Sequence, residues 1–485
     1  MAHFIHRGVI EGFYGRAYAH ADRLWLIDRL GAWGMNRYVY APKDDPLHRA
    51  EWRTPYPAET LEEFADLVHA GERAGVAVGF ALSPGLSIEY SSAEDIRALQ
   101  DKFRGFRALG SQFFCLALDD VPTRLMHTRD QQSFPSLAAA HVTLAHAVAE
   151  AIGPDSTLWV VPTDYVGVEP TEYLEELGCD LDGSIEVGWT GRTVVSPTIT
   201  AAEAARRAET LRRRVVIWDN TPVADGPMRP MLHLGPYAGR DPALAAHASG
   251  VLLNPMQHAH ASGVTISTAA AYMREPAAYD PEHAWQRALD EIGAGAVPAF
   301  ALFAAAHRLS PILPADRDPE LEAAVARLQD ALPNRADVAA ALTAIRPLID
   351  ARVAAAETIR AQLSDRALAA EIEPWLTSHH AESERMSAAA DLLEVLLGDA
   401  APMMRVWAFF RLEGTLTRIP PSAVASYGPR RVLYPQLGSL RDDAAAFSDD
   451  PALFVDRCLA DDVVRLAEEI ALAQLGGKRL GDSGE

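Results

Sequence analysis

Cysteine is scarce in this 485-residue sequence, which contains three: Cys115, Cys179 and Cys458. Their odd number and wide separation exclude a disulfide framework, and none has a second cysteine at the short spacing of a metal site. Isolated cysteines of this kind are typical of reduced, mostly buried thiols in a reducing compartment. We therefore expect a cytoplasmic protein.

Basic residues and long apolar runs are also in short supply. Lysine and arginine number 44 against 66 aspartates and glutamates, which gives a net charge of −22. A chain this acidic repels phosphate backbones and anionic lipid, so we expect neither a nucleic-acid nor a membrane partner. No stretch approaches the roughly 20 apolar residues of a membrane-spanning helix. Residues 1–15 lack the basic and apolar segments of a secretion signal.

Between residues 7 and 275 the sequence alternates repeatedly between short β-rich runs and helical patterns. Eight runs rich in valine, isoleucine and aromatic residues occur at 7–15, 36–42, 76–84, 112–120, 156–165, 183–191, 214–220 and 250–255. Several are apolar throughout, as expected of parallel strands buried on both faces. Eight strand–helix units in roughly 270 residues predict an α/β protein with a (β/α)8 TIM barrel over residues 1–275. A doubly wound open sheet is the competing fold, but it usually has fewer strands.

The second half of the chain has a different composition. After about residue 280 the β-rich runs disappear and alanine-rich segments with heptad-like spacing take their place. Asp280 and Pro281 form a typical helix start, with the aspartate as the cap and the proline in the first turn. We expect a helical bundle domain over residues 276–485, with a long proline- and glycine-containing loop near residues 414–440.

Polar and aromatic residues close the predicted strands, at the end where a TIM barrel carries its active site. They are Glu11, Gly12, Phe13, Tyr14, Lys43, Asp44, Asp45, Asp119, Asp120, Thr163, Asp164, Tyr165, Trp189, Thr190, Trp218, Asp219, Asn220, Asp225 and Asn254. Taken singly, each has an ordinary structural explanation as a turn, cap, surface or core residue. Together they resemble a sugar site, because carboxylates and amides bind hydroxyls and aromatic rings stack on pyranose faces. There is no histidine-rich ligand set, so we expect no metal and no cofactor.

The adjacent carboxylates of Asp119 and Asp120 follow an apolar run directly. Two close acids split their pKa values, so that one stays ionised while the other holds a proton near neutral pH, as a general acid must. Consecutive residues on a strand point to opposite sides, however. The two acids are therefore not expected to flank a glycosidic bond as acid and nucleophile, and the nucleophile remains unassigned by this reasoning.

Seven motifs resemble, in their order, the O-GlcNAcase family of glycoside hydrolases, family 84. They are GVIEGFYGR (8–16), YVYAPKDDPLHR (38–49), ALSPGLSIEY (81–90), LALDDVP (116–122), PTDYVG (162–167), VIWDN (216–220) and LLNP (252–255). The resemblance covers residues 7 to about 275. It implies a retaining exo-β-N-acetylglucosaminidase on a (β/α)8 barrel, which releases β-linked GlcNAc from serine or threonine of glycoproteins or peptides.

The resemblance also implies a role for each matching residue. The substrate's own 2-acetamido oxygen is the nucleophile and forms an oxazoline; Asp119 orients the acetamido N–H, and Asp120 protonates the leaving oxygen and then activates water. The remaining residues implied to bind the sugar are Gly12, Lys43, Asn220, Asp225 and Asn254, with Tyr165 and Trp218 walling the acetamido pocket. Tyr165 also donates to the reacting oxygen. In some relatives the helical domain pairs two subunits, which implies a homodimer.

Three other readings compete with this one. A metal-dependent hydrolase on the same barrel would use Asp119 and Asp120 as ligands. A catalytically idle protein would bind GlcNAc without cleaving it. A β-N-acetylhexosaminidase or hyaluronidase-like enzyme would keep the chemistry but act on bacterial or extracellular glycans.

Overall fold

The computed structural model describes residues 3–308, 310, 312, 318–331, 334–398, 400–416, 463–465 and 467. These residues form two compact units. The barrel unit comprises residues up to 226 and residues 237–284, and the helical unit comprises residues 227–236 and those from 285 onward. The domain boundary near residue 275 stays a prediction. The predicted loop near 414–440 lies outside the described residues from residue 417 on.

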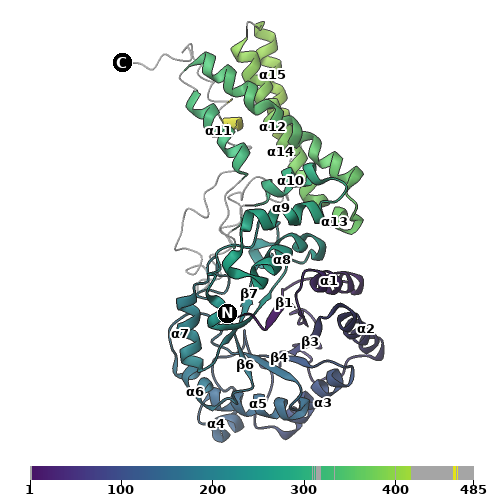
Figure 1. The fold of residues 1–485 in the computed structure, drawn as a ribbon, viewed down its shortest axis with the longest axis vertical. Coiled ribbons are helices and arrows are strands. Elements are labelled where there is room, and N and C mark those ends of the chain that lie inside the picture. Colours follow the sequence, from purple (N-terminus) through teal and green to yellow (C-terminus); the bar gives the residue numbers. More distant parts are fainter. Residues whose placement is uncertain are drawn as a thin grey trace. The chain divides into compact units, whose positions relative to one another are not determined.

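Eight parallel strands close into a barrel in sequence order (Figure 1). Hydrogen bonds between β1 and β8 complete the closure. The strands are β1 (His6–Glu11), β2 (Arg37–Tyr40), β3 (Ala77–Leu82), β4 (Phe113–Ala117), β5 (Thr157–Val161), β6 (Glu186–Trp189), β7 (Val215–Asp219) and β8 (Ala248–Leu253). Each lies within or overlaps one of the predicted apolar runs. The predicted TIM barrel is therefore confirmed.

Helices follow the strands around the barrel. They are α1 (His20–Ala32), α2 (Ala58–Ala74), α3 (Ala93–Ala108), α4 (Thr128–Ser133), α5 (Leu137–Ile152), α6 (Glu172–Asp180), α7 (Ala201–Leu211) and α8 (Ala259–Arg274), with short 3-10 helices η1 (Gly226–Met228), η2 (Leu244–Ala246) and η3 (Pro276–Ala278). Hydroxyl side chains fix several starts: Ser92, Ser136, Thr171 and Thr200 each accept a backbone N–H from the first turn of the helix they precede. Local sequence thus sets where these helices begin.

The inside of the barrel is filled by side chains. Buried residues from the strands, among them Ile10, Val39, Cys115, Trp159 and Leu252, form one apolar cluster. Such layers make a TIM barrel a packed core and leave its chemistry to the loops at the carboxyl ends of the strands.

The helical unit consists of helices, as the sequence predicts. After α9 (Pro281–Ile292), which Asp280 caps through the N–H of His283 at 3.0 Å, come α10 (Val297–Ala306), α11 (Pro319–Ala331), α12 (Arg335–Gln362), α13 (Arg366–Glu371), α14 (Glu373–Leu397) and α15 (Pro402–Leu416). Buried leucines and isoleucines such as Leu342, Ile345 and Leu393 form its core. In the part of the chain that the structure describes, no helix is both long and apolar enough to cross a membrane.

Candidate active site

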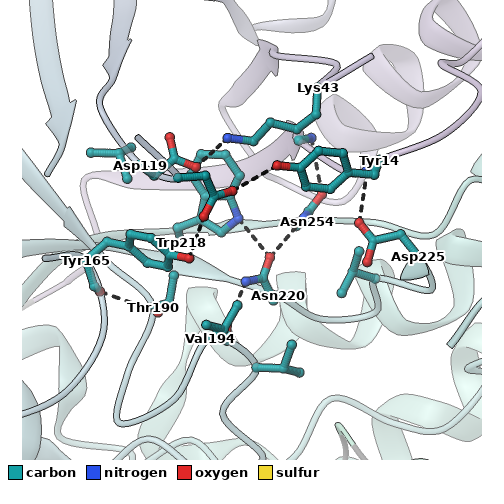
Figure 2. Close-up of a pocket in the computed structure, with 15 residues that line it drawn as sticks. Tyr14, Lys43, Asp119, Tyr165, Thr190, Val194, Trp218, Asn220, Asp225 and Asn254 are labelled. Carbon is teal, nitrogen blue, oxygen red and sulfur yellow. Dashed lines mark hydrogen bonds and ion pairs between the residues drawn. The ribbon is translucent and has the colours of Figure 1, made fainter. Parts of the chain in front are cut away.

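A pocket opens at the carboxyl ends of the barrel strands (Figure 2). The empty space between its lining atoms, with the open solvent at its mouth included, is about 520 Å³. It is lined by Gly12, Tyr14, Lys43, Asp119, Asp120, Val161, Tyr165, Thr190, Val194, Val195, Trp218, Asn220, Val223, Asp225 and Asn254. All nine residues predicted as catalytic or sugar-binding are in this set. The structure therefore brings them together, whereas their individual roles stay predictions.

Asp119 and Asp120 face the same pocket, which corrects one expectation from the sequence. Strand β4 ends at Ala117, so neither acid lies on the strand and the alternation of strand side chains does not apply to them. Asp120 has a φ of 52°, in the left-handed region that aspartate enters more readily than most residues. This backbone turn accompanies the placing of both neighbouring carboxylates in one cavity.

The carboxylate of Asp119 is paired with the ammonium group of Lys43, and both side chains are buried. Lys43 Nζ also lies 5.4 Å from the ring centroid of Trp218, a cation–π distance. The second oxygen of Asp119, Oδ1, is buried and has no hydrogen-bond partner among the described residues. A buried acceptor without a donor is costly in a folded protein, so this oxygen is suited to an N–H or O–H group of a ligand.

The carboxylate of Asp120 lies between two phenols. Tyr14 Oη donates to its Oδ2 and Tyr165 Oη to its Oδ1, both at 2.9 Å. Arg49 donates to the backbone oxygen of Asp120 at 2.9 Å and to Tyr14 Oη at 3.1 Å. Burial, reinforced by the charge of Asp120, raises the pKa of Tyr14 well above its usual value. The phenol therefore stays protonated and donates a hydrogen bond to Asp120.

Sequence reasoning noted Tyr14 at the end of the first strand but gave it no role, and it gave none to Arg49. Tyr14 lies two residues after Gly12, and Arg49 ends the segment that begins with Lys43. This proximity in sequence to predicted site residues was the available signal. Their contacts with Asp120 depend on tertiary structure.

Two asparagines and a tryptophan form a hydrogen-bonded wall of the pocket. Asn220 Oδ1 accepts from Trp218 Nε1 at 2.9 Å and from Asn254 Nδ2 at 2.8 Å, while Asn220 Nδ2 donates to Val194 O at 2.7 Å. Asn254 Oδ1 accepts the N–H of Gly12 at 3.1 Å. These bonds fix the orientation of the Asn220 and Asn254 side-chain amides. Each amide nitrogen uses one N–H in them and has a second N–H with which it can bind a ligand.

Glycine is required at position 12 by the closeness of this wall. A Cβ there would lie 2.3 Å from the ring of Trp218, too close for any other residue without movement of the indole. Asp225 joins the site from the loop after β7, where its Oδ2 accepts the N–H of Tyr14 at 2.9 Å. The ends of β1 and β7 are thereby connected at the pocket.

Several acids at the strand ends do not line the pocket. Glu11 is buried beside Arg23, to which its two oxygens are bonded at 2.9 Å, and beside Tyr38. Asp45 accepts hydrogen bonds from Tyr40 and Tyr56. The remaining strand-end residues outside the lining are Phe13, Asp44, Thr163, Asp164, Trp189 and Asp219. They support or surround the site.

The donor set of the pocket does not suit a metal ion. Among the described residues no group of three or more histidine, cysteine, aspartate or glutamate side chains is placed to hold one. Asp119 already has a cationic partner in Lys43, and Asp120 accepts from two phenols. The arrangement fits a neutral polar ligand with N–H and O–H groups.

Comparison with known proteins gives consistent results. The family model described as NAGidase, beta-N-acetylglucosaminidase, matches residues 7–305. Two curated relatives, Protein O-GlcNAcase of Rattus norvegicus and of Mus musculus, are each 36% identical over 273 residues, which cover 55% of this chain. The match spans only 30% of the length of each relative. The solved structure of an O-GlcNAc hydrolase mutant from Thermobaculum terrenum is 29% identical, with a TM-score of 0.80 over 98% of this chain and 97% of that one.

Proposed function

The chain belongs to the beta-N-acetylglucosaminidase (NAGidase) family, and from this premise we propose that it is a glycoside hydrolase that removes terminal β-linked GlcNAc with retention of configuration. The reaction proceeds by substrate-assisted catalysis through an oxazoline, one of the exceptions among retaining glycosidases. The observation that carries the proposal is the shared pocket of Asp119 and Asp120, in which Asp119 keeps a buried, unpartnered oxygen.

In this scheme Asp119 acts on the acetamido group. Its Oδ1 accepts the acetamido N–H, which orients the amide so that its oxygen attacks the anomeric carbon. As the oxazoline forms, positive charge develops on the amide, and the ionised carboxylate stabilises it. Lys43, paired with the other oxygen of Asp119, orients the carboxylate.

Asp120 acts on the glycosidic bond. In its protonated form it gives a proton to the departing oxygen, and as a carboxylate it then takes one from the water that opens the oxazoline. The two oxygens of Asp120 accept hydrogen bonds from the phenols of Tyr14 and Tyr165. In this scheme Tyr165 transfers its hydrogen bond from Asp120 to the acetamido oxygen when a sugar binds, while Tyr14 remains on Asp120.

The remaining residues of the pocket hold the sugar. Asn220, Asp225 and Asn254 offer amide and carboxylate groups to the hydroxyls, and the backbone of Gly12 lies beside them. Trp218 and Tyr165 wall the acetamido group, together with the apolar side chains of Val161, Val194, Val195 and Val223. A pocket with polar groups for the hydroxyls and apolar side chains for the acetamido group suits the terminal sugar of a chain.

We propose glycoproteins or peptides with GlcNAc on serine or threonine as the substrates, as the names of the relatives suggest. An O-GlcNAc peptide and a free chito-oligosaccharide compared at equal concentration test this choice. Faster turnover of the peptide supports it, and faster turnover of the oligosaccharide favours a hexosaminidase of glycans. A cytoplasmic location and a homodimer through the helical domain remain predictions.

The activity itself is tested with an aryl β-N-acetylglucosaminide and a thiazoline that mimics the oxazoline. We expect hydrolysis of the first and tight competitive binding of the second, because ligands that resemble the transition state bind more tightly than substrates. Binding of GlcNAc without hydrolysis would identify a non-catalytic binding protein. Hydrolysis without thiazoline binding would contradict the substrate-assisted scheme.

A further inference from the structure

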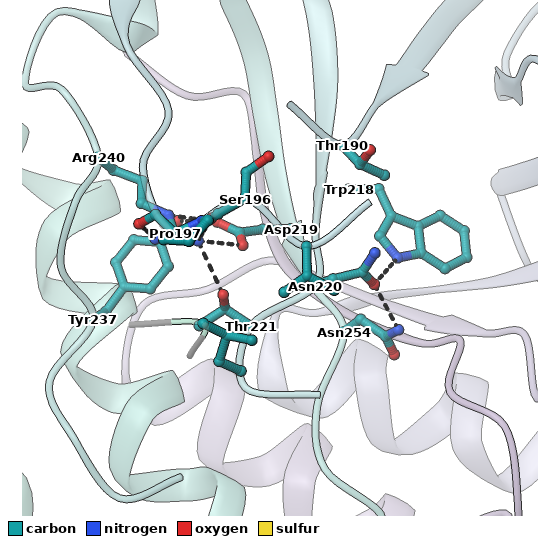
Figure 3. Close-up of polar contacts among 12 residues, drawn as sticks. Thr190, Ser196, Pro197, Trp218, Asp219, Asn220, Thr221, Tyr237, Arg240 and Asn254 are labelled. Carbon is teal, nitrogen blue, oxygen red and sulfur yellow. Dashed lines mark hydrogen bonds and ion pairs between the residues drawn. The ribbon is translucent and has the colours of Figure 1, made fainter. Parts of the chain in front are cut away.

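A buried ion pair lies behind the pocket wall and does not line the pocket (Figure 3). Asp219 lies between Trp218 and Asn220 at the end of β7, and its carboxylate points away from them, as strand alternation requires. There it accepts hydrogen bonds from Arg240 Nε at 2.9 Å, Arg240 Nη2 at 2.6 Å and Tyr237 Oη at 2.7 Å. The Arg240 and Asp219 side chains are only 1% and 2% exposed. The Asp219 carboxylate is therefore held by both the guanidinium of Arg240 and the phenol of Tyr237.

Arg240 uses its remaining N–H groups on other segments. It donates to the backbone oxygens of Ser196 at 3.2 Å and Pro197 at 2.8 Å, and to Thr221 Oγ1 at 2.9 Å. A further bond, of 2.7 Å, goes to the oxygen of Ala238 in its own segment. One guanidinium thus connects the loop after β6, the end of β7 and the segment 237–240.

These connected segments carry one half of the pocket. The loop after β6 includes Val194, whose backbone oxygen holds Asn220 at 2.7 Å. Thr221 begins the loop that leads to Asp225. The backbone oxygen of Asp219 accepts the N–H of Asn254 at 2.7 Å, which ties the end of β8 to the same unit. Asn254 is therefore hydrogen-bonded to Asp219 itself, and Asn220 follows Asp219 in the chain.

We infer that Arg240, Asp219 and Tyr237 form a positioning unit that holds Asn220, Asn254 and the β6 loop in the geometry that the reacting sugar requires. The unit touches no substrate and acts through these residues. The inference rests on the proposed function and extends it to residues outside the pocket. Because a misplacement of about 1 Å costs roughly 100-fold in rate, the unit affects kcat more than KM.

The mildest test removes one hydroxyl group. Tyr237→Phe deletes the Tyr237 bond to Asp219 but leaves the ion pair, so we expect kcat on an aryl β-N-acetylglucosaminide to fall about tenfold with KM changed less than about threefold. Arg240→Lys keeps the charge but loses the planar fork, and its kcat falls roughly 100-fold.

The matched control is Tyr272→Phe. Tyr272 is buried beside Tyr237, with the two ring centroids 5.5 Å apart, and its hydroxyl donates to the backbone oxygen of Asp241 at 2.7 Å. The substitution removes an equivalent phenol bond that does not reach Asp219. We expect kcat to stay at the wild-type value, which separates positioning from a general loosening of the cluster.

A double-mutant cycle decides between positioning and simple stability. If Tyr237 affects kcat by positioning Asn220, then Tyr237→Phe has little further effect on kcat in an enzyme that already carries Asn220→Ala. Equal losses in both backgrounds, an unchanged kcat in Tyr237→Phe, or an equal loss in Tyr272→Phe would overturn the inference. An inactive wild-type enzyme would instead overturn the proposed function, so the two failures are distinguishable.

Discussion

The barrel unit and the helical unit each contain a buried arginine–aspartate pair, and the two pairs do different work. In the barrel, Arg240 binds Asp219 and also joins segments that carry the pocket. In the helical unit, Arg352 binds one oxygen of Asp318 at 2.6 and 2.9 Å, and both side chains are 1% exposed. Asp318 Oδ1 accepts the N–H of Leu321 at the start of α11.

The surroundings of the pairs explain the difference. Arg352 lies on α12 and makes its other bond to the backbone oxygen of Leu348, one turn earlier, so its pair joins α12 to the start of α11. Arg240 instead reaches loops whose neighbours face the pocket. Equal burial and similar chemistry therefore give a structural pair in one unit and a site-supporting pair in the other.

The largest effect is expected inside the barrel pocket. Asp120→Asn removes the proposed proton donor, so turnover of an O-GlcNAc peptide should fall about 10³-fold, with a smaller loss on an aryl glycoside whose leaving group needs little protonation. Asp119→Ala should impair both substrates alike. Steady-state kinetics on the two substrates measure this difference. An equal loss on both in Asp120→Asn would contradict the acid role, and the unfolding midpoint should change little.

The helical unit should show the opposite response. Arg352→Met leaves the Asp318 carboxylate buried without its partner, so the unit should lose about 3–5 kcal/mol of unfolding free energy. Urea unfolding followed by circular dichroism measures the loss, and thiazoline affinity under native conditions should stay at its wild-type value. The control is Arg352→Met with Asp318→Asn, which removes the charge but keeps the helix cap. Failure of this control to recover stability would contradict the assignment.

Acid should destabilise both units through buried neutral histidines. Burial lowers the pKa of His141 in the barrel and of His379 in the helical unit to about 3, and that of His48 to about 4. The unfolded chain therefore binds more protons below about pH 6.5. Stability is complete above that pH and falls toward pH 3–4, by at most about 1.4 kcal/mol per pH unit for each histidine.

Replacement of His141 tests this pH dependence in the barrel alone. His141 is hydrogen-bonded to Tyr90 and Tyr173, both at 2.9 Å, and glutamine offers both a donor and an acceptor in its place. Urea unfolding of His141→Gln between pH 4 and 7 should show a shallower loss of barrel stability. A slope equal to that of the wild type would show that His141 is not a source of the acid sensitivity.

The smallest effect is expected at a helix cap whose residues do not line the pocket. Thr200 and Glu203 form a reciprocal capping box at the start of α7, with bonds of 2.9 and 3.2 Å. Thr200→Ala should cost about 1 kcal/mol of barrel stability with kcat unchanged. Thermal unfolding and the aryl glycoside assay measure both quantities. A drop in kcat would mean that the cap influences the site.

The sequence predicts the barrel well because each strand is a compact apolar run and several helix starts have a local side-chain cap. It also predicts that Asp119, Lys43 and Asn254 line one pocket, because the carboxyl ends of the barrel strands meet at one face. It does not distinguish Glu11 and Asp219, which face away from the pocket, from acids that line it, because strands buried on both faces show no alternation. The direction of a side chain there depends on partners such as Arg23 and Arg240.

Contacts between residues far apart in the chain could not be predicted from the sequence either. Tyr14 and Asp120 are 106 residues apart, and Arg240 and Asp219 are separated by a loop of no regular pattern. The left-handed backbone at Asp120, which invalidates the strand-alternation argument, has no signature in the residues around it. In the helical unit the alanine-rich pattern predicts helices but not the pairing of Asp318 with Arg352.

The packed interior of the barrel has a consequence for the order of product release. Side chains such as Phe113 and Trp159, whose rings stack with centroids 6.4 Å apart, fill the described barrel below the site. We therefore expect a bound sugar to leave through the mouth by which it entered. In the proposed mechanism the aglycone occupies that mouth and has to depart before water reaches the oxazoline, so we expect free GlcNAc to be released last and to compete directly with the next substrate.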